Sequence, residues 1–414
     1  MTVSLLWGVV GCSNIIYDDY PVESGSETEL VTLVLNVGMV AESRAGADNP
    51  RESMHDLRIV LLDASGKVEY NEYIPLTGVE RFGEKIIRTV PGAKKIFLIA
   101  NEKSLSSVRM TGSDQEQQSL SEIMESDAAK VGAANFEALA EAIYFTPGDY
   151  GQMNIPLSSS YEFTIPVGAK RIEQTFYLVH AATKFEFKFI NERESAVRID
   201  ALSISSLAED MYLMANFGET PATRKTVEWT QNGAARSAYW IDWLREVSDA
   251  TTSNPADPDN ELVNKTYGWI SDYELPPTEP QKPQEHKTRN LIAGENPVIA
   301  RTYDIPVASA ETPSVTLPTV YFPESKNISA AAANRQDYSF SVKLTDTGSN
   351  TSKEFSDIRL NYISGSQENL VTLFRNTHVK VTCTVGYEAQ EMTLNLLIGI
   401  CPWNYEEINI PTFD

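Results

Sequence analysis

The side chains that could act as nucleophiles, general bases or metal ligands are few and lie far apart in this sequence of 414 residues. No histidine has a partner at the spacing of a metal site or a catalytic triad; the four are His55, His180, His286 and His378. An acidic stretch that could suggest a calcium loop lacks the turn glycine, so we interpret it as a solvated loop: Asp257, Asp259 and Glu261. The sequence therefore predicts a protein that is not an enzyme, with no catalytic residue, metal site or cofactor.

Cys12 is the residue whose neighbours indicate a chemical modification. Residues 3–11, VSLLWGVVG, are too short to span a bilayer but resemble the apolar core of a signal peptide. The run Val9-Val10-Gly11-Cys12 resembles a lipobox, in which only a thiol can take the diacylglyceryl thioether. We therefore expect residues 1–12 to be a lipoprotein signal segment, lipidated at Cys12. Residues 1–4 carry no basic side chain, which indicates a truncated or misplaced start. The alternative is a buried N-terminal strand with an ordinary cysteine.

Arg44 is the first basic residue of the chain, because residues 1–43 contain neither lysine nor arginine. A trypsin-like protease would find its first site between Arg44 and Ala45, where the small residues 45–47 favour an accessible loop. Arg51 is a second candidate. The alternative is that Arg44 is an ordinary solvated loop residue.

A strand just before Arg44 is predicted from the alternation of apolar residues over Val31–Met39. Its apolar face consists of Val31, Leu33, Leu35, Val37 and Met39. Burial of each side chain contributes roughly 1.5–3 kcal/mol, so the whole face contributes on the order of 10 kcal/mol as an upper bound. Removal of this strand would leave an apolar groove and unpaired backbone groups, which together can accept another strand.

Most of the remaining sequence has the pattern of short strands separated by turns, which favours a mostly β fold over a doubly wound α/β sheet. Two amphipathic helices are predicted over residues 113–127 and 133–143. Charged residues cluster just before residue 196. We place the domain boundary there, between an N-terminal β-sandwich domain at 13–195 and a C-terminal β-sandwich domain at 196–414.

Residues 215–300 form a long irregular insertion in the second domain, rich in proline, aspartate and asparagine. It holds four tryptophans: Trp229, Trp240, Trp243 and Trp269. We expect these rings to pack within a partly ordered insertion, with a partner surface or carbohydrate stacking as the functional alternatives. After the insertion, one strand is predicted over Ser314–Phe322 and a late one over Met392–Ile400.

The formal net charge of −23 disfavours nucleic acid as a partner, because phosphate binding requires clustered cations. The three cysteines form neither a disulfide framework nor a zinc-binding spacing. Cys383 shares the apolar face of a predicted strand, which indicates a buried free thiol. A bridge between Cys383 and Cys401 stays open as an alternative.

Several stretches follow the Cys12 and Arg44 region in order: LVHAATKFEFKFIN, LPTVYFPESKN, LVTLFRNTHVKVTCTV and CPWNYEEINIP. Their most specific parts are Tyr321–Glu324, Phe374–Thr377 and Pro402-Trp403. In this order they resemble the fimbrillin family, the FimA-like pilus subunits of Bacteroidetes-type bacteria. The resemblance runs through most of the chain, and residues 215–300 have no counterpart in it.

The resemblance implies two tandem transthyretin-like β-sandwich domains in a lipoprotein precursor that is anchored in the outer membrane. It also implies that an Arg-specific or trypsin-like protease removes the first strand. A donor strand from another pilus subunit, often its C-terminal segment, would then fill the groove. The product would be a cell-surface fimbrium that adheres to a host protein or glycan. Two segments are candidate donors, Met392–Ile400 and the more weakly alternating Glu407–Phe413. The alternative for both is an ordinary last strand of the second domain, and for Met392–Ile400 it has equal weight.

Two other functions stay open. An anchor or tip adhesin of the same pilus would keep its first strand or fail to donate one. A glycan-binding lipoprotein of a polysaccharide-uptake system would use the tryptophan-rich insertion, with Trp243 as the ring to test.

Overall fold

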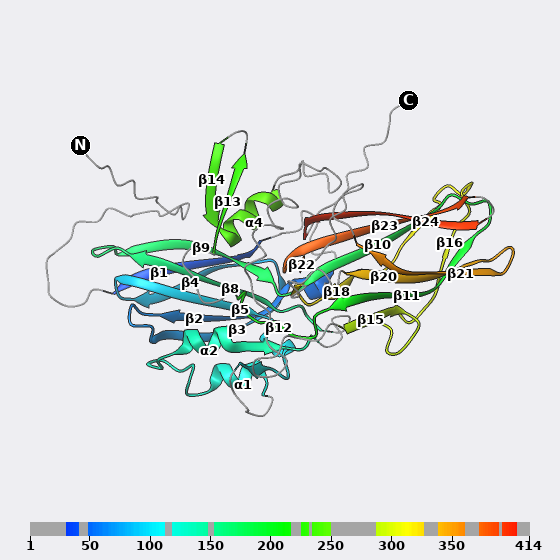
Figure 1. The fold of residues 1–414 in the computed structure, drawn as a ribbon. Coiled ribbons are helices and arrows are strands. Elements are labelled where there is room, and N and C mark those ends of the chain that lie inside the picture. The colour runs from blue at the N-terminus through cyan, green and yellow to red at the C-terminus, as the bar shows by residue number, and fades with distance from the viewer. Residues whose placement is uncertain are drawn as a thin grey trace, which may run out of the picture.

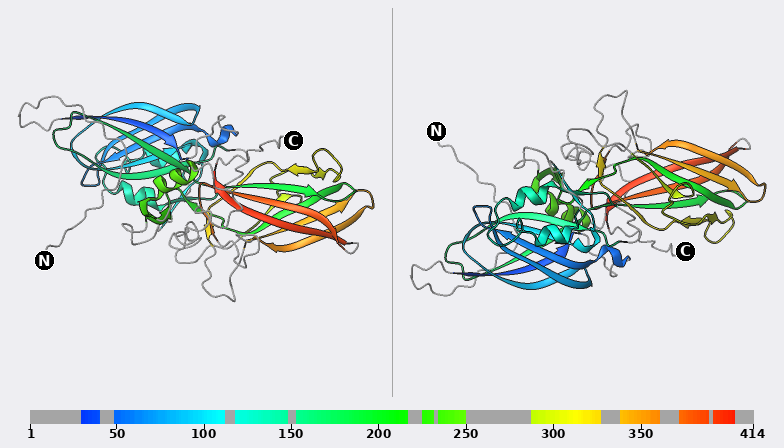
Figure 2. Two further views of the ribbon diagram at one scale, coloured as in Figure 1. Left: turned by 90° about the horizontal axis from the view of Figure 1, so that it is seen from above. Right: turned by 90° about the horizontal axis from the view of Figure 1, so that it is seen from below.

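The chain forms two β-sandwiches in tandem along the long axis of the molecule (Figures 1 and 2), which confirms the predicted mostly β class. Among the residues that the structure describes, no helix is long and apolar enough to cross a bilayer. The computed structural model describes residues 30–40, 49–111, 118–147, 153–216, 225–231, 234–249, 287–326, 338–360, 372–388 and 391–403.

The first sandwich packs a sheet of order β4-β1-β9 against a sheet of order β3-β2-β5-β8. The two sheets are continuous through a short pairing of β8 with β9 at Leu157 and Ser158. Inward side chains of β1, β2 and β5 meet between the sheets and form one hydrophobic core. The strands are β1 (Val31–Met39), β2 (Met54–Leu62), β3 (Val68–Val79), β4 (Arg81–Thr89), β5 (Gly92–Ala100), β8 (Leu157–Ile165) and β9 (Arg171–His180).

A layer of short helices covers the outer face of the β3-β2-β5-β8 sheet, where Phe97 meets Phe136 edge to face at 5.4 Å. A capping box begins the first helix, because the Ser119 and Glu122 side chains each bond the other residue's backbone N–H. Both predicted helices are present but shorter than predicted: the one predicted over 113–127 begins only at Leu120, after its cap at Ser119, and residues 112–117 lie outside the described residues. The layer contains α1 (Leu120–Glu125), α2 (Phe136–Ala142), the short helices η1 (Pro50–Glu52) and η2 (Glu102–Ser104), and the sheet of β12 (Met211–Tyr212), β7 (Ile143–Phe145) and β6 (Arg109–Met110).

The second sandwich packs a sheet built around β10 and β23 against a sheet built around β11 and β20. The first sheet has the order β17-β10-β23-β24 with β18 beside β10, and the second has the order β15-β11-β20-β21 with β16 beside β11. The strands are β10 (Thr183–Asn191), β11 (Val197–Leu207), β15 (Lys287–Ile292), β16 (Tyr303–Ile305), β17 (Ser314–Thr316), β18 (Val320–Phe322), β20 (Ser339–Asp346), β21 (Thr351–Arg359), β23 (Thr377–Glu388) and β24 (Glu391–Pro402). Two further short strands, β19 (Ser325–Lys326) and β22 (Thr372–Leu373), pair with each other.

The single strand predicted over Ser314–Phe322 is wrong in one respect, because the chain forms two strands, β17 and β18, on either side of Pro318. Proline has no N–H to contribute to a ladder, so the pairing with β10 is interrupted there.

The chain passes from the first sandwich to the second at Ala181-Ala182, because β10 already pairs in parallel with β23 from Thr183 onward. The boundary predicted at residue 195 lies later, in the loop between β10 and β11. The chain then returns briefly to the first domain, where β12 pairs with β7. The chain therefore passes between the two domains more than once.

Part of the predicted insertion is a β-hairpin followed by a helix: β13 (Thr226–Gln231), β14 (Ala234–Tyr239) and α4 (Trp240–Asp249). The hairpin projects from the body of the molecule in Figure 1, while α4 lies against the region where the two sandwiches meet.

Candidate functional site: the first strand and the domain junction

Strand β1 occupies an interior position in its sheet, between β4 and β9. It runs antiparallel to β4, with Val31 opposite Thr89, and parallel to β9, with Met39 opposite Leu178. The backbone on both of its sides is therefore used in pairing. Taking β1 away would expose one hydrogen-bonding edge on β4 and one on β9, and each edge could pair with a replacement strand.

The inward face of β1 is part of the core of the first sandwich. All five predicted inward side chains are at most 2% exposed, and the strand has the predicted bounds: Val31, Leu33, Leu35, Val37 and Met39. They share one cluster with side chains of β2 and β5 from the facing sheet. The prediction of a buried first strand is thus confirmed, and its loss would open an apolar slot in the sandwich.

The outward face of β1 carries one polar contact point at Asn36. The pairing with β4 shifts between Leu35 and Val37, and Glu84 of β4 has a left-handed backbone with a φ of 62°. Asn36 Oδ1 accepts a hydrogen bond of 3.1 Å from the Glu84 N–H. On the opposite side, Asn36 Nδ2 donates a hydrogen bond of 3.0 Å to Glu173 Oε1 of β9.

The predicted modification residues Cys12, Arg44 and Ala45 lie outside the described residues. Arg51, the second candidate cleavage residue, lies in helix η1. Its carbonyl accepts a hydrogen bond of 2.9 Å from the Ile155 N–H, and the next residue, Glu52, is buried. A protease requires several residues in an extended and accessible form, so this helical turn protects the bond after Arg51.

The structure describes one of the two C-terminal donor candidates. Met392–Ile400 lies within β24, which pairs with β23 from Glu391 to Pro402 and buries Met392 and Ile398 in the second sandwich. That segment is the last strand of its own domain. The other candidate, Glu407–Phe413, lies outside the described residues.

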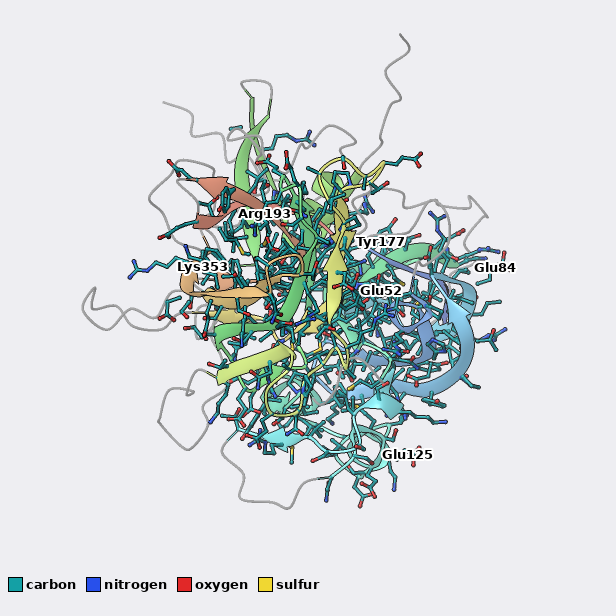
Figure 3. All side chains as sticks on the ribbon, turned by 90° about the vertical axis from the view of Figure 1, so that its right-hand side faces the viewer. Glu52, Glu84, Glu125, Tyr177, Arg193 and Lys353 are labelled. Carbon is teal, nitrogen blue, oxygen red and sulfur yellow. The ribbon has the colours of Figure 1, made fainter. Side chains whose placement is uncertain are left out.

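The junction between the sandwiches is built around the carboxylate of Glu52, which is 2% exposed. Three donors from the second sandwich reach it: Tyr321 Oη at 2.5 Å, Trp403 Nε1 at 2.7 Å and Lys184 Nζ at 3.1 Å. Figure 3, in which Glu52 is labelled, shows it near the middle of the molecule seen end-on. The buried charge is paired and hydrogen-bonded, as a charge in a dry interior must be.

His180, at the end of β9, extends this junction. Its ring stacks on Trp403 at a centroid distance of 4.2 Å, and its Nε2 lies 2.9 Å from the backbone oxygen of Glu52. Its Nδ1 lies 2.9 Å from Asn376 Oδ1. Burial lowers the pKa of His180, although Glu52 and Asn376 act in the opposite direction. His180 is therefore a structural residue that packs between the domains.

A second buried pair lies beside the first. Arg375 is fully buried, and its guanidinium binds both carboxylate oxygens of Glu324, with Nε to Oε2 at 2.9 Å. The same guanidinium donates to the carbonyls of Tyr212 at 2.7 Å and Leu213 at 2.8 Å, in the segment that pairs with the first domain. Arg375 therefore fastens the second sandwich to the helical layer of the first.

The sequence stretches that carried the family resemblance all converge on this junction. Tyr321–Glu324, Phe374–Thr377 and Pro402-Trp403 supply Tyr321, Glu324, Arg375, Asn376 and Trp403. Sequence reasoning marked these stretches without assigning them a contact, and it missed Glu52 and Asn36. The asparagine inside the apolar run of β1 was a signal from which Asn36 could have been identified.

Helix α4 contributes to the junction through its aromatic residues. Trp240 is 3% exposed and Trp243 is 0% exposed, and both belong to the core cluster of the second sandwich. Arg245 lies over the ring of Tyr177 on β9 at 4.5 Å. The packing interpretation of these two tryptophans is confirmed. Stacking of Trp243 on a glycan is contradicted, because its ring has no exposed surface.

Cys383 is a free, buried thiol, as predicted, and burial raises its pKa. It lies opposite Leu396 in the β23–β24 pairing, whereas Cys401 lies opposite His378. Five positions along a strand correspond to about 17 Å, so the alternative bridge between the two cysteines does not form in this register.

Within the described part of the chain, no group of three or more histidine, cysteine or acidic side chains could hold a metal ion.

No protein-family model and no curated protein matches the sequence. Several solved structures resemble this chain at low sequence identity. The tip fimbrial protein Mfa3 from Porphyromonas gingivalis, with a C-terminal truncation, is 12% identical, with a TM-score of 0.49, over 91% of this chain and 100% of that chain. A fimbrilin, FimA, from P. gingivalis W83 is 12% identical, with a TM-score of 0.44, over 91% of this chain and 99% of that chain. A cell adhesion protein from Parabacteroides distasonis is 13% identical, with a TM-score of 0.44, over 90% of this chain and 97% of that chain. These three structures are named as a tip fimbrial protein, a fimbrilin and a cell adhesion protein.

Proposed function

We propose that this protein is a structural subunit of a cell-surface fimbrium that functions in adhesion. It is exported as a lipoprotein precursor anchored in the outer membrane through Cys12, and a trypsin-like protease cuts it after Arg44. Release of β1 then opens the slot between β4 and β9, and a strand from another subunit fills it. The observation that carries the proposal is the interior position of β1, whose five inward side chains are at most 2% exposed.

The position of the proposed cut supports this sequence of events. Val40, just after β1, donates its N–H to the Leu178 carbonyl at 2.9 Å, and Asn49 begins helix η1. The first basic residue of the chain, Arg44, falls between these two anchored points. A cut there separates β1 from the rest of the chain while η1 stays held by Glu52.

Limited trypsin digestion of the full chain tests the cut. We expect a new N-terminus at Ala45, read by N-terminal sequencing, and loss of that product in Arg44→Gln. The matched control is Arg51→Gln, which should be cut like the parent protein because Arg51 lies in a helical turn. A chain that is first cut elsewhere would contradict the proposal.

Assembly is tested on the cut protein. We expect it to form ladders on unheated gels, because a refilled slot buries apolar side chains worth on the order of 10 kcal/mol as an upper bound. A protein that is cut after Arg44 but stays monomeric would instead act as the anchor or tip of the fimbrium. Replacement of Cys12 by serine should abolish labelling of the precursor with a radioactive fatty acid.

The glycan-binding alternative has lost its main support, because the ring of Trp243 is fully buried. We therefore propose no glycan site on α4.

A further inference from the structure

Asn36 and the groups around it define a polar notch on the outward face of the sheet, on the opposite side from the apolar slot that β1 fills. Resting on the proposed function, we infer that this notch selects the strand that refills the slot. The notch consists of the backbone N–H of Glu84 on β4 and the carboxylate of Glu173 on β9. It favours a strand with an asparagine between two aliphatic residues, as in Leu35-Asn36-Val37.

The first half of the notch arises from a bulge in β4. Leu35 pairs with Lys85 and Val37 with Phe82, so Gly83 and Glu84 together face the single residue Asn36. The extra residue of a bulge is left outside the regular ladder, and here its N–H bonds the Asn36 side chain at 3.1 Å. Figure 3 shows the labelled Glu84 at the outer edge of the first sandwich.

The glycine of the bulge makes room for the amide. A Cβ atom built on Gly83 would lie 3.2 Å from Asn36 Oδ1, which is tighter than an ordinary contact. A larger residue at 83 would therefore push the amide away from the Glu84 N–H. The shape of β4 at this point suits a side chain of asparagine size.

The second half of the notch fixes the chemistry of that side chain. Glu173 Oε1 accepts a hydrogen bond of 3.0 Å from Asn36 Nδ2, so the side chain must donate on one side and accept on the other. A leucine offers neither group. An aspartate offers acceptors alone and would place a second carboxylate against Glu173. An amide satisfies both partners without adding charge.

This requirement bears on which segment of a second copy fills the slot. Each C-terminal candidate contains the pattern, as Leu394-Asn395-Leu396 and as Ile408-Asn409-Ile410. The first lies in β24, and its withdrawal would open the core around Met392 and Ile398. The occupant is therefore the segment around Asn409 of a second copy, with Ile408 and Ile410 in the inward positions of Leu35 and Val37.

Peptide binding to the trypsin-cut full chain tests the selection. The probes are fluorescent peptides covering residues 30–40, 391–402 and 405–414, each with asparagine or with leucine in place of Asn36, Asn395 or Asn409. We expect the asparagine form of the 30–40 and 405–414 peptides to bind about five- to tenfold more tightly than the leucine form, as one or two exposed hydrogen bonds supply. Glu173→Ala should reduce this preference, whereas the control Glu162→Ala, an exposed carboxylate on β8, should leave it unchanged.

A second measurement needs no cleavage. In the intact chain, Asn36→Leu should speed hydrogen exchange of the Glu84 amide, whereas Asn36→Asp keeps an acceptor for that amide and should leave it protected. Equal affinities of the asparagine and leucine peptides, with unchanged Glu84 exchange, would overturn the notch. Tight binding of the 391–402 peptide together with no binding of the 405–414 peptide would overturn the choice of occupant. Failure of every peptide, including 30–40, would count against strand exchange itself, and faster Glu84 exchange in Asn36→Leu would then still establish the contact.

Discussion

The indole N–H of Trp403 donates a hydrogen bond of 2.7 Å to the carboxylate of Glu52, which lies 351 positions earlier in the chain. Glu52 ends helix η1, between β1 and β2 of the first sandwich, and Trp403 directly follows the last strand of the second. The two sandwiches are thus joined at one buried carboxylate. Because Lys184 and Tyr321 bind the same group, the junction depends on Glu52 more than on any one of its partners.

Replacement of Glu52 by alanine should lower the free energy of unfolding by about 3–5 kcal/mol, because it leaves the Lys184 ammonium buried without a counter-charge. Urea unfolding followed by tryptophan fluorescence measures the change. The control is Asp127→Ala, which removes the exposed partner of Lys130 and should cause no measurable change. A Glu52→Ala protein as stable as the parent would show that the junction does not hold the domains.

The buried Arg375–Glu324 pair should behave as a unit. Arg375→Met leaves a buried carboxylate unpaired and should cost about 3–5 kcal/mol of unfolding free energy, and Glu324→Leu should cost a similar amount. The double variant should lose much less than the sum, because neither charge remains. Additive losses in the double-mutant cycle would contradict the pairing.

Trp243→Ala should destabilise the protein by about 3–5 kcal/mol, because it opens a cavity in the core of the second sandwich. Differential scanning calorimetry measures the loss, with Ser237→Ala on the exposed face of β14 as the control. At a temperature where the variant is folded, a glycan array should give the same result for the variant and the parent. A glycan signal that depends on Trp243 would contradict the buried position.

Stability should fall on acidification because of His378. Burial, with Lys184 and Lys380 nearby, holds the pKa of His378 well below its usual value. Between that lowered pKa and about 6.5, the unfolded chain binds a proton that the folded chain excludes, so the unfolding free energy decreases as the pH falls through this window. Above it, the contribution is constant.

His378→Gln should therefore weaken the pH dependence, with the remainder coming in part from His180, whose pKa burial also lowers. Urea unfolding at neutral pH and at about pH 5 provides the comparison. An identical loss of stability on acidification in the variant and the parent would exclude His378 as a source.

The sequence pattern predicted those features of the fold that depend on residues close together in the chain. Strand β1 has the bounds expected from the alternation of Val31–Met39, because every second side chain of this segment packs in the core of the first sandwich. Helix α1 formed where an apolar stripe follows the capping box at Ser119, and α2 formed along the second apolar stripe, without a side-chain cap. The free thiol of Cys383 followed from the same alternation on β23.

Contacts between distant segments could not be predicted in this way. The position of β10 in the second sandwich depends on a parallel pairing with β23, nearly two hundred residues later, and charge clustering misplaced the transition. The donors to Glu52 come from three strands or their ends, and no spacing in the sequence relates them. The bulge opposite Asn36 belongs to β4, so nothing in the pattern of β1 reveals it.

The pairing of β1 with both neighbours has a mechanical consequence. A pull directed along the axis of a strand in this slot loads the ladders to β4 and β9 in shear, so the bonds along its whole length share the tension. A strand at an open edge that is peeled sideways gives way one bond at a time. A filament linked through this slot would for that reason resist drag from flowing liquid far better than its individual hydrogen bonds suggest.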